Sequence, residues 1–192
     1  MAEYDYFMIN KPFGMLSQFT KEGKRAVLGE MYNFPKDVYP VGRLDADSEG
    51  LLLLTNDKRL NQMLLNPEKQ TLKTYLVQVD GAISEMAIEQ LRMGVEIKVK
   101  KQRYKTKPAV VNQVDTPEWL KPRVPPVRFR ANIPTSWLSI KISEGKNRQI
   151  RRMTASVGFP TLRLIRTGIG SFQMNSWAPP VQKLDASVIH TF

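Results

Sequence analysis

Hydrophobic and polar residues alternate over several short stretches of the chain, which is the pattern of strands with one buried face. The clearest case is 136–142, where Leu138, Ile140 and Ile142 alternate with Trp137, Ser139 and Lys141. A strand of another kind is expected at 51–55, a short apolar run typical of a strand buried on both faces. Further strands are expected at 6–9, 39–44, 74–79, 95–98, 109–114, 162–165 and 183–189.

Apolar residues spaced three and four apart predict helices between these strands. The segment that begins at the N-cap Ser84 and ends at Gly94 places Ile88 and Leu91 on one face. Other helices are expected at 27–32, from an N-cap at Asn56 to Leu65, and from an N-cap at Asn147 to Val157. Because strands outnumber helices and alternate with them irregularly, the predicted fold class is α+β with a mostly antiparallel sheet.

Positive charge is concentrated in one part of the chain. The whole sequence of 192 residues has a net charge of +11, while the segment 98–166 alone holds 17 basic and 3 acidic residues. A surface that is only solvated usually mixes both signs of charge. The asymmetry therefore favours contact with a polyanion, and with nucleic acid in particular.

Several classes of protein lack their sequence signals here. The longest strongly apolar run, 51–54, is far shorter than the ~20 residues that cross a bilayer. Cysteine is absent and the single histidine is His190, so disulfides, zinc–thiolate sites and histidine triads are not expected. The absence of cysteine leads us to expect a cytoplasmic location. The glycine-rich fingerprints of dinucleotide and P-loop proteins are also missing.

The acidic segment 45–50 admits three interpretations. Asp45, Asp47 and Glu49 followed by Gly50 have the spacing of a calcium loop, but Asn56 stands where an EF-hand needs a bidentate glutamate. Asp45 follows a predicted strand, where catalytic groups often lie, and it is equally suited to an ordinary turn. Position alone leaves the catalytic and turn interpretations open.

Two basic segments are candidates for RNA contact. Five prolines at 117–134 are interleaved with aromatic and basic residues, which suits either a stiff linker or an RNA-contacting arm. In the helix expected after Asn147, the apolar face holds Ile150 and Met153, and three arginines share the opposite face. The basic candidates are Lys121, Arg123, Arg128 and Arg130 in the proline-rich segment, and Arg148, Arg151 and Arg152 in the helix.

Five groups of residues along nearly the whole chain stand out together. They are Asn10-Lys11-Pro12-Phe13-Gly14, Val41-Gly42-Arg43-Leu44-Asp45 followed by 48–57, Lys73-Thr74-Tyr75-Leu76-Val77 with Gly81, Glu144-Gly145-Lys146-Asn147-Arg148-Gln149-Ile150-Arg151-Arg152-Met153, and Leu164-Ile165-Arg166 with Gly170. In this order they resemble the motifs of RNA pseudouridine synthases. Similarity is greatest to the branch that modifies ribosomal RNA, and the loop 117–138 is similar to members that act on the large subunit.

The resemblance implies one catalytic domain over residues 1–192, a length that also allows two lobes. Its mixed, mostly antiparallel sheet would be flanked by helices and carry a central RNA-binding cleft. The first motif begins within ten residues of the start, so the N-terminal S4-type domain of most of the branch is not expected. Substrate binding would then fall to the catalytic domain itself.

The implied activity is the isomerisation of a specific uridine to pseudouridine in RNA, and the expected substrate is large-subunit (23S) ribosomal RNA. The reaction breaks the N1–C1′ bond, turns the uracil and rejoins it through C5, and it requires no cofactor or metal. The alternatives are an inactive RNA-binding module, which should have lost Asp45, Tyr75 or Arg151, and a DNA-binding protein, whose usual motifs are missing. The expected partner is a ribosomal RNA stem-loop, bound by a monomer without membrane or DNA contact.

The resemblance assigns catalytic roles to three residues. Asp45 would act on the ribose, either by attacking C1′ or by taking a proton from C2′. Tyr75 would stack on the flipped base, and Arg151 would pair with the ionised Asp45. Simpler roles remain open: Tyr75 as a half-buried strand residue, and Arg151 as a phosphate contact.

Seven further residues are expected to bind substrate. Arg43 would fill the gap in the RNA or bind a phosphate, with a salt bridge as its simpler role, and Ile150 would pack under the base. The others are Lys11, Arg148, Arg152, Arg128 and Arg130.

Overall fold

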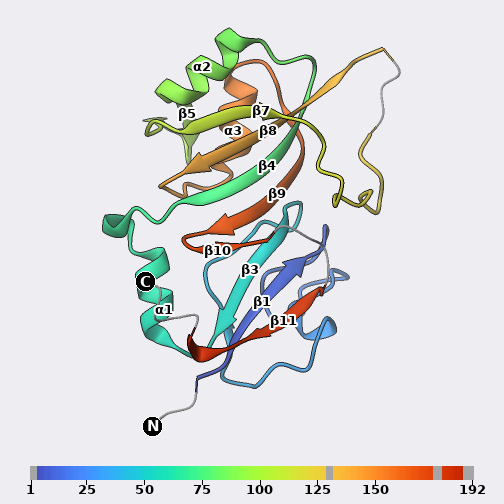
Figure 1. The fold of residues 1–192 in the computed structure, drawn as a ribbon, viewed down its shortest axis with the longest axis vertical. Helices are drawn as coiled ribbons and strands as arrows, with labels where there is room; N and C mark the ends of the chain where they lie inside the picture. The colour runs from blue at the N-terminus through green and yellow to red at the C-terminus, as the bar shows by residue number, and fades with distance from the viewer. Residues whose placement is uncertain (1–3, 129–131, 175–178, 188–192) are drawn as a thin grey trace. The chain divides into compact units, whose positions relative to one another are not determined.

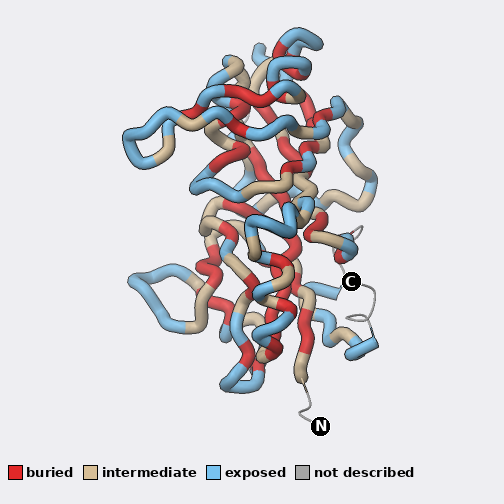
Figure 2. The backbone as a smooth tube through the Cα atoms, turned by 90° about the vertical axis from the view of Figure 1, so that its left-hand side faces the viewer, coloured by how far each residue is buried: buried red, intermediate tan, exposed pale blue. Residues whose placement is uncertain are grey.

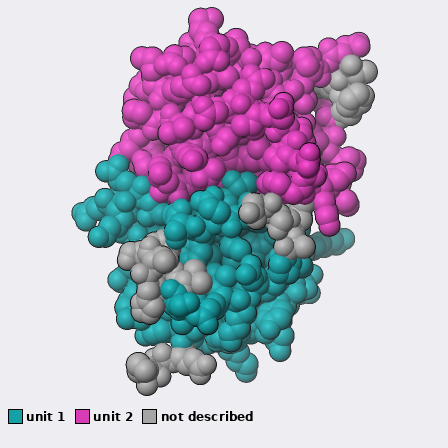
Figure 3. All heavy atoms as spheres, in the orientation of Figure 1, with its two compact units in different colours: residues 1–71, 166–192 teal, residues 72–165 magenta. Residues whose placement is uncertain are grey.

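The computed structural model describes residues 4–128, 132–174 and 179–187 (Figure 1). The chain divides into two compact units, residues 1–71 with 166–192 and residues 72–165 (Figure 3). The strand β9, Thr161–Ile169, contributes residues to both units.

The first unit is built around β3, Glu49–Thr55, whose seven residues are all buried (Figure 2). The strand β1, Tyr6–Lys11, pairs antiparallel with β3 and, at its other edge, with β11, Val181–Leu184. The short β2, Tyr39–Pro40, also pairs with β3, and β10, Phe172–Gln173, pairs with β9. The helix α1 spans Lys58–Leu65, and 3₁₀ turns lie at Leu28–Glu30 and Pro67–Lys69.

The second unit has β4, Lys73–Asp80, paired antiparallel with β8, Thr135–Ile142, which also pairs with β7, Val110–Val114. The helices α2, Glu85–Met93, and α3, Gln149–Ser156, share one hydrophobic core with β4 and β8. Val77, Leu138, Leu91 and Met153 from these four elements are all buried in it. A separate hairpin is formed by β5, Glu96–Val99, and β6, Gln102–Lys105.

The α+β fold class with a mostly antiparallel sheet is confirmed, and so is the buried alternation of Leu138, Ile140 and Ile142. Several element boundaries differ from the sequence predictions. The strand expected at 39–44 is confined to residues 39–40, the helix expected at 27–32 is a single 3₁₀ turn, and β6 and β10 were not predicted. The strand expected at 183–189 is β11, which ends at Leu184, and 188–192 lie outside the described residues.

Two predicted N-caps are displaced by one residue. Asp57, not Asn56, caps α1, because its Oδ1 accepts from the Arg59 N–H at 2.9 Å while Asn56 accepts from the backbone of Asp5. Arg148, not Asn147, stands at the N-cap of α3, with a φ of 52°. Ser84 caps α2 as predicted. No helix within the described part of the chain is long and apolar enough to cross a membrane.

Candidate active site

The loop that carries Asp45 is held on both sides of the aspartate. Leu44 is buried in the core of the first unit, and its backbone N–H and carbonyl both bond the Ser17 hydroxyl, at 3.1 and 2.8 Å. On the other side, the Ala46 carbonyl accepts from the Gly14 N–H at 2.7 Å. Asp45 itself is half-buried, and its carbonyl accepts from the Ser48 N–H at 3.0 Å. The backbone around the carboxylate is therefore fixed by residues 14–17.

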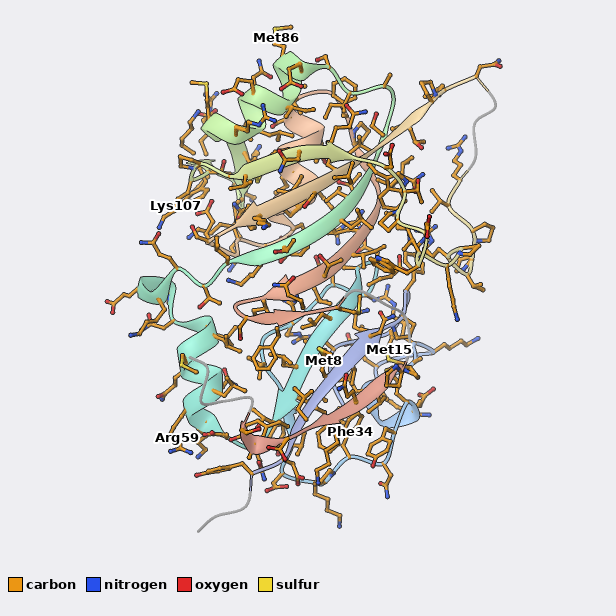
Figure 4. The ribbon with its side chains drawn as sticks, viewed as in Figure 1. Met8, Met15, Phe34, Arg59, Met86 and Lys107 are labelled. Carbon is orange, nitrogen blue, oxygen red and sulfur yellow. The ribbon has the colours of Figure 1, made fainter. Side chains whose placement is uncertain are left out.

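Lys11 lies entirely inside this unit, with no exposed surface. Its ammonium donates to the carbonyls of Met15 at 2.8 Å, Pro12 at 3.0 Å and Ala46 at 3.5 Å; Met15 is labelled in Figure 4. Burial lowers the pKa of Lys11 to about 8, although nearby carboxylates, Asp45 among them, oppose the shift. Its three described bonds go to backbone carbonyls, of which that of Ala46 belongs to the Asp45 loop. The expected contact of Lys11 with RNA stays a prediction from the resemblance.

Arg43 is exposed at the start of the same loop. Its Nη2 donates to the Gln18 side chain at 3.1 Å, so its described partner is a neutral amide. The charged guanidinium therefore lies at the surface, two residues before Asp45 in the sequence. The predicted contact with an RNA phosphate stays compatible with this position.

Tyr75 and Ile150 belong to the second unit and meet at the same core. Tyr75 lies on β4 opposite Ile140 of β8 and is half-buried against the core that includes Ile150. Ile150 is buried in the first turn of α3. The half-buried position of Tyr75 fits its simpler role as a strand residue and its predicted role as a stacking surface.

The loop before α3 is held by the Glu144 carboxylate. One oxygen accepts from the Gln149 amide at 2.6 Å and from the Lys107 backbone N–H at 2.9 Å, and the other accepts from the Tyr104 hydroxyl. The Gln149 side chain, which is 3% exposed, also accepts from the Lys146 N–H at 2.9 Å. Hydrogen bonding to Glu144 raises the pKa of Tyr104 to about 12. Figure 4 labels Lys107, which follows the hairpin.

The three arginines of α3 are placed differently. Arg148 is exposed, and Arg151 is half-buried with a bond from its Nη1 to the Thr161 carbonyl at 3.4 Å. Arg152 donates to the carbonyl and side chain of Asn147 at 3.0 and 3.3 Å, and also to the Lys98 carbonyl. One of these bonds joins α3 to β5 of the hairpin, and the other two hold the loop before α3, so a contact of Arg152 with RNA would come in addition to this structural role.

The proline-rich segment 115–134 begins and ends in the second unit, where it connects β7 to β8. Arg123 donates within the segment to Pro125 and Pro126 and reaches the Leu162 carbonyl of β9 at 3.4 Å. Arg163 of β9 donates back to Lys121 at 2.9 Å. These bonds anchor the segment to β9, which is compatible both with a stiff linker and with an RNA-contacting arm. Arg128 is exposed on it, and Arg130 lies outside the described residues.

The calcium interpretation of the segment 45–50 gains no support from the geometry. Among the described residues, no group of three or more histidine, aspartate or glutamate side chains is arranged to hold a metal ion.

Comparison with known proteins decides what these two motif loops belong to. The family model described as RNA pseudouridylate synthase matches residues 5–156, which include both loops. The chain belongs to the RNA pseudouridine synthase family. Among similar curated relatives, "Ribosomal large subunit pseudouridine synthase E" of Vibrio parahaemolyticus is 53% identical over 173 residues, covering 90% of this chain and 70% of the relative. The protein of the same name from Xanthomonas axonopodis pv. citri is 45% identical over 182 residues, covering 94% and 93%.

Solved structures agree with the family assignment. The crystal structure of a pseudouridylate synthase aligns with a TM-score of 0.74 at 26% identity, over 99% of this chain and 74% of that one. Human RNA pseudouridylate synthase domain containing 1 aligns with a TM-score of 0.58 at 14% identity, over 86% and 74%, a likeness of fold alone. The resemblance drawn from the sequence motifs is confirmed.

Sequence reasoning missed the residues that hold the two motif loops of this synthase. Ser17 and Tyr104 lie outside the quoted motifs, and their isolated hydroxyls carry no sequence signal. Glu144 and Gln149 stand inside the fourth motif group, but the sequence analysis gave neither residue a role. The predicted catalytic residues are divided between the units, Asp45 in the first and Tyr75 with Arg151 in the second. Their meeting in one site stays a prediction from the resemblance.

Proposed function

We propose that this synthase isomerises a uridine of large-subunit ribosomal RNA to pseudouridine, with Asp45 as the carboxylate that acts on the ribose. The observation that supports this most is the fixation of the Asp45 loop by Ser17, Gly14 and Lys11. A catalytic carboxylate must be held close to its target atom, because small displacements cost large factors in rate. The relatives named for the large ribosomal subunit support the choice of RNA.

Two roles suit a carboxylate at the ribose. Asp45 either attacks C1′, as nucleophilic carboxylates do in glycosidases, or takes a proton from C2′ as a general base. Uridine with deuterium at C2′ separates the two. Proton removal in the rate-limiting step slows with deuterium, whereas direct attack at C1′ does not break that bond.

The second unit supplies the groups proposed for the base. To reach Asp45 the uridine must leave its stack, which costs a few kcal/mol and is offset by contacts in the pocket. Tyr75 offers an aromatic face, Ile150 packs beneath the base, and Arg151 balances the charge of Asp45. These roles are carried over from the family motifs onto the matching residues.

The proposed partner is a stem-loop of ribosomal RNA. The basic segment 98–166 attracts its phosphates, with Arg128 and Arg148 exposed for contact, and Arg43 of the first unit is exposed as well. Contacts to 2′-hydroxyl groups would select RNA over DNA. We propose that the synthase acts as a monomer in the cytoplasm, where ribosomal RNA is found, and that it uses no cofactor.

The substitution Asp45→Asn tests the proposed function most directly. It preserves the size of the side chain but removes a carboxylate that an amide replaces neither as nucleophile nor as base. Pseudouridine formation in large-subunit RNA fragments should fall at least about a thousandfold, equivalent to about 4 kcal/mol of activation free energy. RNA affinity should stay the same or rise slightly, because a negative charge near a polyanion is lost.

Asp47→Asn is the matched control, since it makes the same chemical change two residues away in the same turn. It should fold, bind RNA and keep most of the activity. Thermal melting, RNA binding and pseudouridine formation are measured on one preparation of each variant. A folded Asp45→Asn protein that still forms pseudouridine would refute the proposed mechanism.

A further inference from the structure

The hairpin β5–β6 has an unusual turn. Val99 pairs with Gln102, so Lys100 and Lys101 form a two-residue connection, and their φ angles are 46° and 68°. A two-residue turn with both φ angles positive is the type that Asn-Gly or Gly-Gly normally occupies. Lysine has no conformational advantage there, and non-glycine residues held in this region are strained, most often where function requires them. The turn therefore carries two positive charges at the cost of a strained backbone.

The exposed face of the hairpin shows the same preference. Lys98 and Arg103 lie directly opposite each other on the two strands, and both are exposed. Like charges in directly opposed positions destabilise a strand pair. The Arg103–Glu96 contact at 3.2 Å is an exposed pair that compensates little. Within residues 96–105 there are five basic residues and one acidic residue.

The hairpin is nevertheless held firmly from its inner side. Ile97 is buried in the core of the second unit, and the Tyr104 hydroxyl donates to Glu144 in the loop before α3. Arg152 of α3 donates to the Lys98 carbonyl, and the Lys105 ammonium donates to the Gly94 carbonyl at 2.7 Å. The hairpin thus holds mutually repelling cations above a strained turn, and it is fixed to the loop before α3, which carries a family motif.

We propose that the β5–β6 hairpin is an RNA-binding arm that takes backbone phosphates of the substrate between Lys98, Arg103 and the turn lysines. Bound phosphates would relieve the repulsion between Lys98 and Arg103, because an anion between two cations is attracted to both. RNA is favoured over a membrane, since both turn residues, Lys100 and Lys101, are charged and the turn offers no apolar side chain to insert into lipid. The choice of RNA as the polyanion rests on the proposed function.

The double substitution Lys100→Asn with Lys101→Gly tests the arm. It installs the residues that this turn type prefers while removing two charges, so the variant should melt at a higher temperature than the wild type. RNA affinity should nevertheless fall about tenfold, and the slope of log affinity against log salt should become shallower by about 1.5. Gain of stability with loss of binding is an outcome that damage to the fold cannot produce.

The control is Lys58→Gln with Lys69→Gln, which removes two exposed charges from α1 and the 3₁₀ turn after it. It should lose no more than about twofold in RNA affinity. Unchanged affinity in the hairpin variant, or an equal loss in the control, overturns the proposal. So does weakened binding to phosphatidylserine vesicles with unchanged RNA binding. Pseudouridine formation by the wild type is measured on the same RNA. If it is absent while hairpin-dependent binding persists, the proposed function fails and the arm stands.

Discussion

The Asp45 loop and the loop before α3 carry family motifs of the same enzyme, yet they are held in different ways. Around Asp45 the bonds are buried: Ser17 is 3% exposed and Lys11 fully enclosed, and both bond backbone atoms of the loop. Before α3 the central group is the half-buried carboxylate of Glu144, which accepts from Tyr104 and Gln149. One loop is part of a core, and the other is fastened at the surface.

The difference teaches where stability and catalysis are coupled. A buried polar group that loses its partner retains its full desolvation cost, whereas a half-exposed group is rehydrated by water. Substitutions around Asp45 should therefore reduce both the free energy of unfolding and the rate. Substitutions around Glu144 should reduce the rate with little effect on stability.

The largest expected effect on stability is that of Lys11→Met, which keeps the length of the side chain but leaves the carbonyls of Met15, Pro12 and Ala46 without their donor. The free energy of unfolding at pH 7 should fall by about 2–3 kcal/mol, and turnover should fall with it. Chemical denaturation and pseudouridine assays on one preparation measure both. Lys36→Met, at an exposed turn, is the control and should change neither.

Lys11 also predicts a dependence of stability on pH. Its pKa is about 8 in the folded protein, against about 10.4 in the unfolded chain, so the unfolded state binds more protons between these values. The unfolding free energy of the wild type should therefore rise from pH 8 to pH 10, and that of Lys11→Met should not. Above pH 10 the raised pKa of Tyr6, about 12, acts in the opposite direction. Parallel curves for the two proteins would contradict the assignment.

Ser17→Ala should have the next largest effect. It removes a hydroxyl that both donates to and accepts from Leu44, leaving a buried N–H and a buried carbonyl unsatisfied. A loss of about 1–3 kcal/mol in unfolding free energy is expected, with a lower kcat and a nearly unchanged KM for RNA. Ser17→Thr retains the hydroxyl and should recover part of both losses. A stable, fully active Ser17→Ala variant would show that the Asp45 loop does not depend on the hydrogen bonds between Ser17 and Leu44.

The sequence predicts much of this fold because several signals are local. Ser84 and Gly94 delimit α2 correctly, and the alternation of Leu138, Ile140 and Ile142 identifies the inner face of β8. The motif that contains Asp45 is contiguous in the chain and identified the family, while the catalytic role of Asp45 stays a prediction. Such features depend on neighbours within a few residues.

The supporting residues depend on distant partners and were not predicted. The Ser17 hydroxyl meets Leu44 across 27 residues, and Tyr104 meets Glu144 across 40. Lys11 was expected to bind substrate from its place in the first motif, and lysine is rarely buried, so only the surrounding carbonyls reveal its position inside the first unit. The hairpin strand β6 was missed because Lys100, Lys101 and Arg103 do not resemble a strand or a two-residue turn.

The smallest effect on stability is expected for Glu144→Gln, which preserves one carbonyl acceptor for the Lys107 N–H but weakens the bonds from Tyr104 and Gln149. Because Glu144 is only half-buried, the unfolding free energy should fall by less than about 1 kcal/mol. The kcat should fall severalfold, since the start of α3 positions Arg151. RNA affinity should fall by a smaller factor, because the Tyr104 bond to Glu144 also holds the β5–β6 hairpin. Glu144→Ala, which also abandons the Lys107 contact, should lower kcat further, while Glu118→Gln at an exposed position should leave it unchanged. A Glu144→Gln variant that loses as much stability as Ser17→Ala would mean that both loops belong to the core, and the contrast between them would be wrong.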